Sequence, residues 1–193
     1  MKRIFTLLTI YSLCFGAFAQ EMSSFTDSRD GKTYKSAVIR IELEGGIFIE
    51  REWMAENLNF ETEGSVCYKN YPAYCGKFGR LYNWVDAKLA CPEGWHLSTQ
   101  LEWQELMLNY GGYKTAASAL KEGGASNLNI LMGGFSNVEG QFSDIGKTAH
   151  LWDAEIGNKK TAGLISLYAD YNEVAHDVIS ARNMNSCRCV KDY

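Results

Sequence analysis

The chain has 193 residues, 46% of them hydrophobic, and a formal net charge of −4. This is enough apolar material for one sizeable core. The acidic balance excludes a typical nucleic-acid-binding domain, which carries a basic stripe. Only two prolines occur, Pro72 and Pro92. Because no proline-rich linker divides the chain, we expect a single domain.

The first 19 residues are typical of a secretory signal peptide. Lys2 and Arg3 form a positive start, residues 4–15 are almost wholly apolar, and Ala17-Phe18-Ala19 matches the small-x-small pattern that precedes cleavage. The apolar run is shorter than the ~20 residues that cross a bilayer. We therefore expect a signal peptide at 1–19 and a mature domain at 20–193 that is secreted, periplasmic or on the cell surface, without membrane insertion.

The first predicted elements are two hairpins followed by a loop. Asp30-Gly31 is a tight-turn signal and predicts one hairpin tip. Two β-leaning runs, 37–43 and 47–53, are joined by Glu44-Gly45-Gly46, which predicts a second hairpin. Residues 61–77 are rich in Gly, Tyr and Asn and predict a loop.

Helical patterns come next. Residues 81–90 carry apolar side chains at the spacing of one helical face, namely Leu81, Trp84, Val85 and Leu89. A second helix is expected to begin at Ser98-Thr99, where Thr99 and Glu102 fit a capping box, and to end at Gly111-Gly112. Residues 115–121 fit one more short helix.

The last part of the chain favours loops and then strands. Residues 122–146 are rich in Gly and Asn, which predicts long loops with short strands. Strands are expected at 150–153, 162–168 and 178–190. The order of strands, helices, loops and strands is typical of an α+β fold rather than of repeated βαβ units.

Five cysteines remain after removal of the signal peptide, and export favours disulfide bonds. Cys67 and Cys75 flank a short aromatic loop and are expected to pair. Cys91 is expected to pair with the C-terminal segment. Only one of Cys187 and Cys189 can be its partner, so the other is left odd. We expect no metal site, because no Cys-x-x-Cys pair occurs and the three histidines are scattered.

Five motifs occur in a specific order: FTDSRDGKTY at 25–34, WMAENLNF at 53–60, GRLYNW at 79–84, CPEGWHL at 91–97 with Glu102-Trp103, and CVKD at 189–192. Together they resemble the Fibrobacter succinogenes major paralogous domain, a family of exported bacterial proteins. That family is similar in turn to the C-type lectin-like fold and to the formylglycine-generating enzyme family. The resemblance implies an α+β, C-type lectin-like fold with two helices packed on short antiparallel sheets with long loops. It also implies a Cys91–Cys189 bridge, which leaves Cys187 as a free thiol, and no established molecular activity.

The sequence departs from the family pattern in three places. Ser98 stands where a proline is usual, and the 40–49 segment is longer than the usual turn between short strands. Cys187 replaces an apolar residue of the last strand. A second cysteine beside Cys189 therefore leaves open which of the two pairs with Cys91.

Ligand-binding residues are sought among aromatic side chains in loops, since an aromatic ring offers a flat apolar face to a sugar and a neighbouring carboxylate can bond its hydroxyls. Trp53, Trp84, Trp95 and Trp103 lie in core patterns and are assigned to packing. For the tyrosines, an ordinary surface position without a ligand is an equally good interpretation. The candidates are Tyr68, Tyr71, Tyr74, Trp152, Asp153, Tyr168, Asp170 and Tyr171.

The chain lacks the common catalytic signatures, such as Gly-x-Ser-x-Gly, His-Glu-x-x-His and a phosphate loop. His96 is interpreted as a hydrogen-bonded structural residue. The calcium-binding motifs of true C-type lectins are absent, and the sequence indicates no cofactor and no catalytic residue.

Three hypotheses follow for the function. The first is a non-catalytic module that binds polysaccharide or glycoprotein at the cell surface. The second is a structural or protein-interaction domain of the cell envelope. The third is a diverged enzyme related to the formylglycine-generating family, which would require a reactive thiol at Cys187 or Cys189.

Overall fold

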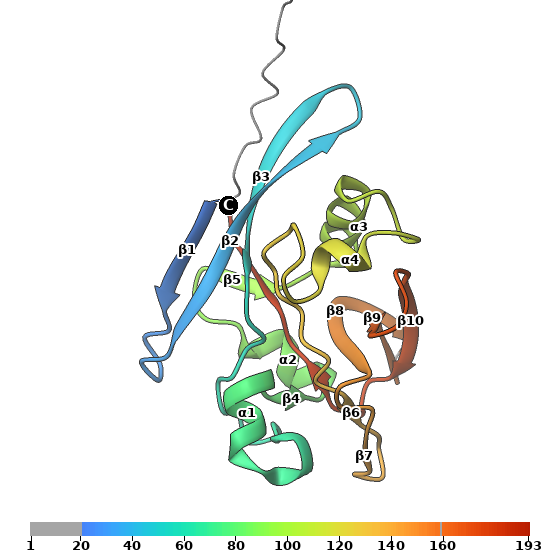
Figure 1. Cartoon of the computed structure of the whole chain (residues 1–193). Coiled ribbons are helices and arrows are strands. Elements are labelled where there is room, and N and C mark those ends of the chain that lie inside the picture. Colours follow the sequence, from blue (N-terminus) through green and yellow to red (C-terminus); the bar gives the residue numbers. More distant parts are fainter. Residues whose placement is uncertain (1–20, 159) are drawn as a thin grey trace, which may run out of the picture.

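The computed structural model describes residues 21–158 and 160–193 (Figure 1). The predicted signal peptide at 1–19, with Cys14, lies outside the described residues. Among the described helices, none is both long and apolar enough to cross a membrane. The described residues form a mixed α+β structure with two five-stranded sheets and one two-stranded sheet.

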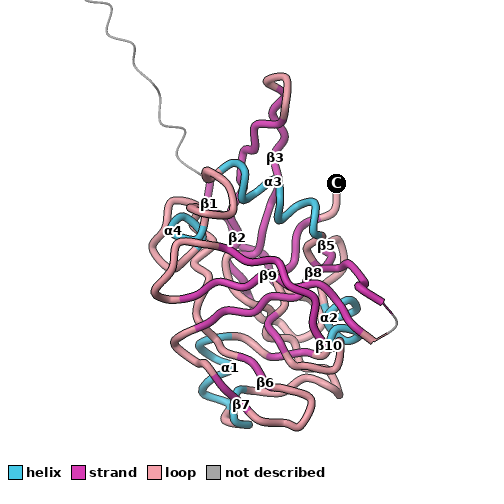
Figure 2. Tube along the Cα trace, turned by 90° about the vertical axis from the view of Figure 1, so that its right-hand side faces the viewer, coloured by secondary structure: helices cyan, strands magenta, loops and turns pink. Residues whose placement is uncertain are grey.

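The first sheet holds both predicted hairpins. Its order is β1 (Glu21–Thr26), β2 (Thr33–Leu43), β3 (Ile47–Met54), β12 (Cys189–Lys191) and β5 (Trp95–Leu97), with every pair antiparallel. The turn at Asp30-Gly31 joins β1 to β2, and the turn at 44–46 joins β2 to β3. The outer end of the β2–β3 hairpin projects beyond the body of the molecule (Figures 1 and 2).

The second sheet lies across the core from the first. Its order is β10 (Val174–Ser180), β9 (Thr161–Tyr168), β8 (Thr148–Asn158), β11 (Asn185–Ser186) and β4 (Leu81–Tyr82), and only the β11–β8 pair is parallel. Strands β6 (Phe135–Ser136) and β7 (Phe142–Ser143) form the small third sheet.

The prediction of one strand over 178–190 is wrong. The chain reverses after β10, where the N–H of Asn183 donates to the carbonyl oxygen of Ser180. Strands β11 and β12 then enter different sheets. A bend that begins in a polar turn and ends in two short strands leaves little periodic signal in the sequence.

The predicted loop at 61–77 contains two helical segments, the 3-10 turn η1 (Tyr68–Asn70) and helix α1 (Pro72–Phe78). Pro72 occupies the first helical turn, where its fixed φ favours a helix and its missing N–H costs nothing. The glycine and tyrosine content of the segment concealed this start signal.

Helix α2 (Trp84–Ala90) begins three residues later than predicted, since residues 81–82 form β4. The side chain of Asn83 accepts a hydrogen bond from the N–H of Asp86 and caps the helix. The buried residues of the helix are Trp84, Ala87 and Ala90. Val85 and Leu89, which the sequence placed on one apolar helical face with Trp84, are 57% and 77% exposed.

Helix α3 (Gln100–Asn109) begins as predicted. Thr99 and Glu102 form both hydrogen bonds of the capping box. Trp103, Leu106 and Met107 are buried, and the Trp103 ring lies 4.7 Å from that of Trp53 between centroids. The short helix α4 (Ala117–Leu120) falls within the predicted 115–121 segment.

Two hydrophobic clusters form the core. One lies between the first sheet, α3, α4 and strands β8 and β9, and the other surrounds α2. Trp53, Trp84 and Trp103 are buried in them, as predicted. Trp95 is only partly buried and stacks on Phe25 at 4.2 Å between ring centroids.

Candidate functional site

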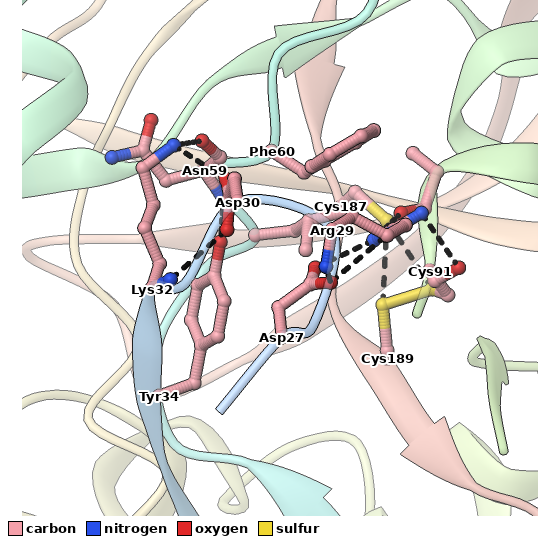
Figure 3. A network of polar contacts seen from close by, with 12 residues as sticks. Asp27, Arg29, Asp30, Lys32, Tyr34, Asn59, Phe60, Cys91, Cys187 and Cys189 are labelled. Atoms are coloured by element: carbon pink, nitrogen blue, oxygen red, sulfur yellow. Dashed lines mark hydrogen bonds and ion pairs between the residues drawn. A yellow bond between two sulfur atoms is a disulfide. The ribbon is translucent and has the colours of Figure 1, made fainter. Parts of the chain in front are cut away.

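The charged residues of the first motif hold the fold together (Figure 3). The guanidinium of Arg29 donates to both carboxylate oxygens of Asp27 and to the carbonyl oxygens of Ala90 and Cys91, at the end of α2. It also lies 3.7 Å from the centre of the Phe60 ring. Burial acts to raise the pKa of Asp27, but the hydrogen bonds and charge of Arg29 outweigh it and the pKa is lowered. A cation at the end of a helix is favourable, so this motif is structural.

Three sulfur atoms lie close together beside the Asp27–Arg29 ion pair (Figure 3). Cys91 and Cys189 form a disulfide, and the Sγ of Cys187 lies 3.9 Å from that of Cys91 and 4.0 Å from that of Cys189 (Figure 3). Burial raises the pKa of the Cys187 thiol to about 12, so the thiol stays protonated at neutral pH and is a weak nucleophile. A metal ion would find one thiolate at most here, because the other two sulfurs are bonded to each other. The bridge that the family resemblance implied is confirmed.

A cleft of about 520 Å³ lies beside the start of β2. Its walls are the start of β2, the segment that follows β3, the end of α1, and the loop that follows α4. The charged and polar residues that line the cleft, with the aromatic ring of Phe78, include Lys32, Lys35, Glu56, Asn57, Lys77, Phe78, Glu122 and Arg188.

One of the residues that line the cleft is a buried cation, Arg188. Arg188 is fully buried and donates to Asn57 Oδ1 from Nε (3.2 Å) and Nη2 (2.7 Å). Its Nη1 donates to the carbonyl oxygens of Met54 (2.8 Å) and Leu128 (2.7 Å). Burial lowers the pKa of this guanidinium to about 9. Arg188 thus joins the 54–57 segment to the loop that follows α4 through neutral acceptors.

Glycine is required where α1 meets this wall. Gly79 ends α1 with φ +77°, a conformation that L side chains rarely adopt. A Cβ atom here would lie 2.7 Å from the Cβ of Asn57. The side-chain amide of Asn57 also donates to the carbonyl oxygen of Phe78 at 2.9 Å. This close approach fixes the end of α1 against the Arg188 network.

Aromatic rings lie in a row along α1 and lead to the cleft. Tyr71, Tyr74 and Phe78 are spaced by three and four residues, the spacing of one helical face. Consecutive ring centroids lie 6.3 Å apart, and Phe78 lines the cleft itself. Tyr68 is buried below the row, edge-on to Tyr74 at 5.4 Å. We call Tyr71, Tyr74 and Phe78 the aromatic row.

The predicted Cys67–Cys75 bridge is confirmed, and it closes the loop that carries Tyr71 and Tyr74. Cys75 also lines the cleft, so the bridge borders it. A closed loop of this kind limits how far its side chains can move.

The sequence profile described as the Fibrobacter succinogenes major domain matches residues 49–191. The chain belongs to this family. Comparison with curated proteins and with solved structures finds no match. The C-type lectin-like fold and the relation to the formylglycine-generating family therefore stay predictions, while the α+β class is confirmed.

Two predicted ligand residues of this Fibrobacter succinogenes major domain are core residues instead. Trp152 is fully buried, and its indole N–H donates to the carbonyl oxygen of Tyr82 at 2.7 Å. Asp153 is also fully buried and accepts from the Glu155 N–H and from His176 Nε2. Neither side chain can offer a free face or a free oxygen to a sugar. Both residues lie on β8, which is covered on both faces where they stand. The local sequence does not indicate this burial.

Tyr68 is 4% exposed, so its ring is also buried and is not a ligand surface, while the other predicted residues lie in two separate regions. Tyr68, Tyr71 and Tyr74 belong to the region of η1 and α1. Tyr168, Asp170 and Tyr171 lie at the turn between β9 and β10, which is hydrogen-bonded to α4 through the Ala117 N–H and Asn172 carbonyl. Helices α1 and α4 lie well apart in Figures 1 and 2. Tyr171 is 65% exposed, and its ring meets that of Tyr168 edge-on at 6.2 Å.

Sequence reasoning missed the polar part of the cleft. Asn57 and Arg188 are buried polar residues that shape it, and Lys35 and Lys77 line its opening. One signal was available: Arg188 stands between Cys187 and Cys189, and alternate residues of an extended segment face opposite sides. If the cysteines are buried, a charged residue on the opposite side of the segment needs a polar environment.

One trio of this domain has the residue types of a nucleophilic triad. Ser166 Oγ lies 2.9 Å from His150 Nδ1 and donates to Asp177 Oδ2 at 3.2 Å. In such triads histidine lies between serine and carboxylate. Here serine lies in the middle, so the carboxylate does not orient the histidine. Burial also lowers the pKa of His150. We assign the trio to packing of β8, β9 and β10.

His96 has the structural role that its motif predicted. Its Nδ1 lies 2.6 Å from Asp192 Oδ1, and its Nε2 lies 3.0 Å from Glu102 Oε1. Hydrogen bonding to Glu102 is the main cause that raises the pKa of His96. Both ring nitrogens are occupied, which joins the start of α3 to the segment after β12.

Proposed function

We propose that this Fibrobacter succinogenes major domain is an exported, non-catalytic module that binds polysaccharide or glycoprotein in the cleft beside α1. The observation that carries the proposal is the aromatic row, which leads from the Cys67–Cys75 loop into a polar cleft. Flat apolar rings beside amide, ammonium and carboxylate groups suit sugar rings and their hydroxyls. The signal-like N-terminus and two disulfides support export.

The chemistry of the described residues supports binding rather than catalysis. The free thiol of Cys187 is buried and held protonated by a pKa of about 12. The Ser166 trio has the wrong order for nucleophilic attack, and His96 is occupied by two carboxylates. The groups that line the cleft instead donate and accept hydrogen bonds.

The test compares two exposed tyrosines on different surfaces. The mature protein, residues 20–193, is screened by calorimetry against plant, microbial and host polysaccharides and glycoproteins, with and without a calcium chelator. We expect Tyr71→Ala to weaken binding about tenfold, since a lost ring contact of about 1.4 kcal/mol corresponds to that factor. Tyr171→Ala is the matched control, because the two tyrosines are 61% and 65% exposed.

The outcomes separate the possible sites. Loss of binding in Tyr171→Ala alone would place the ligand at the β9–β10 turn and overturn the assignment to the cleft. Absence of binding across the whole panel would overturn the proposal. We expect the chelator to change nothing, because the sequence lacks the calcium-binding motifs of true C-type lectins and the carboxylate of Asp153 is buried and hydrogen-bonded.

A second candidate function is a protein-interaction domain of the cell envelope. The feature that favours it is the projecting β2–β3 hairpin, whose tip exposes Ile47 and Phe48. Exposed apolar side chains on a projecting element are typical of protein contacts. This candidate predicts an empty polysaccharide screen, which distinguishes it from the first.

A further inference from the structure

The cleft beside α1 is basic although the chain is acidic. Over the whole sequence, 23 acidic residues exceed 19 basic ones. Among the residues that line the cleft the balance is reversed: Lys32, Lys35, Lys77 and Arg188 stand against Glu56 and Glu122. A local excess of positive charge in a concave site raises the local concentration of anions.

The three lysines of the cleft differ in whether their ammonium groups already have polar partners. The ammonium of Lys32 donates to Asp30 Oδ2 at 2.8 Å and to the carbonyl oxygen of Asn59 at 2.7 Å, so it is occupied (Figure 3). Lys35 and Lys77 are exposed, and within the described part of the chain neither forms an ion pair with a carboxylate. Glu56 is engaged by the backbone N–H of Lys35 at 2.8 Å rather than by its ammonium. Two ammonium groups are thus available to a ligand.

Arg188 adds a charge that no carboxylate neutralises by contact. All four of its hydrogen bonds go to neutral oxygens, those of Asn57, Met54 and Leu128. A guanidinium has five N–H donors, so one is left over. Burying a cation without a paired anion is costly, and a bound anion nearby relieves that cost. The lowered pKa of Arg188 expresses the same cost.

The end of α1 brings charge and ring together. The ammonium of Lys77 lies 5.1 Å from the centre of the Phe78 ring, and both residues line the cleft. A negatively charged sugar could therefore place its ring on the aromatic row and its acidic group on Lys77. A neutral sugar would offer no charged group to pair with the ammonium groups of Lys35 and Lys77.

We propose that the ligand of this cleft is an anionic polysaccharide, whose carboxylate or sulfate groups contact Lys35 and Lys77 in the cleft that the buried Arg188 also lines. The inference rests on the proposed function and narrows its ligand to one charge class. Carboxylate and sulfate share the chemistry that two ammonium groups recognise, so the experiment separates them by ligand.

The experiment titrates the mature protein with two matched pairs of polysaccharides. Polygalacturonate is compared with its fully methyl-esterified form, and dextran sulfate with dextran, so each pair differs mainly in charge. We expect the charged member of at least one pair to bind about tenfold more tightly. Binding should weaken when salt rises from about 50 mM to about 300 mM, because salt screens exposed charges. The pair that shows the difference identifies carboxylate or sulfate.

Variants test whether the cleft is responsible. Lys35→Gln and Lys77→Gln should each weaken binding of the charged polysaccharide about three- to tenfold. Lys114→Gln is the matched control, an exposed lysine outside the cleft, and should change binding less than about twofold. An equal loss in all three variants would show general attraction to a basic surface and overturn the inference.

The two proposals fail differently. Equal binding of charged and neutral members, lost in Tyr71→Ala, would keep the proposed function and overturn the anionic ligand. Absence of binding to every polysaccharide would overturn both. Circular dichroism of each variant checks that these surface substitutions leave the fold intact.

Discussion

The two disulfide bridges lie in regions built in different ways. Cys91–Cys189 joins the end of α2 to β12, spans 98 residues and sits beside the buried thiol of Cys187. Cys67–Cys75 spans 8 residues, closes a surface loop and borders the cleft. The first bridge connects elements that the sequence keeps far apart, whereas the second restrains side chains beside a candidate ligand site. We therefore expect the first to control stability and the second to control binding.

Breaking the buried bridge should have the largest effect on stability. In the entropic account, a closed loop of about 100 residues contributes roughly 4–5 kcal/mol. Cys91→Ser should lower the free energy of unfolding by about that amount in a urea titration of the mature protein. Two thiols, Cys187 and Cys189, should then react with a thiol reagent after denaturation.

Cys189→Ser is the informative partner variant. Because Cys187 Sγ lies only 3.9 Å from Cys91 Sγ, we expect a Cys91–Cys187 bridge to form in its place. No thiol should then react after denaturation, and the stability loss should be clearly smaller than in Cys91→Ser. Two reactive thiols and an equal loss in both variants would show that Cys187 cannot replace Cys189.

Removing the surface bridge should affect stability less and binding more. The double change Cys67→Ser with Cys75→Ser should cost roughly 2–3 kcal/mol, because the closed loop is short. The loop that carries Tyr71 and Tyr74 would lose its restraint, so polysaccharide affinity should fall several-fold by calorimetry. Unchanged affinity in a folded double variant would contradict the division of labour between the bridges.

The smallest expected effect concerns His96, which joins the segment after β12 to Glu102 at the start of α3. The pKa of His96 is raised, first by hydrogen bonding to Glu102, so its contribution is present below about pH 6.5 and is lost as pH rises through the folded pKa. Burial acts to raise the pKa of Glu102, but hydrogen bonds from His96 and Thr99 outweigh it and the pKa is lowered. That contribution is present above about pH 4.5 and is lost as pH falls through the folded pKa.

His96→Gln should therefore lower stability more at about pH 5.5 than at about pH 8. The difference should be about 1 kcal/mol or less, because the imidazole is 37% exposed and solvent screens its ion pairs. Urea titrations of both proteins at both pH values measure it. A larger loss at the higher pH would show that the charged histidine does not contribute to the attachment.

Local signals account for the elements that the sequence predicted well. The Asp30-Gly31 turn, the 44–46 turn and the capping box of Thr99 and Glu102 each depend on residues a few positions apart. The Cys67–Cys75 bridge is equally local. The buried face of α2 was mispredicted because the small residues Ala87 and Ala90 face the core with Trp84, while the larger Val85 and Leu89 are exposed.

The sequence by itself determined the turns, the capped helix α3, the α+β class and the short bridge, because these depend on the chain's immediate neighbours. Only the tertiary structure decided the burial of Trp152 and Asp153, and it confirmed the partner of Cys91 that the family resemblance had implied. It also assembled the basic cleft, in which Arg188 binds Asn57 from 131 positions away. Contacts across such separations depend on how sheets and loops pack together, and periodicity along the chain carries no record of that packing.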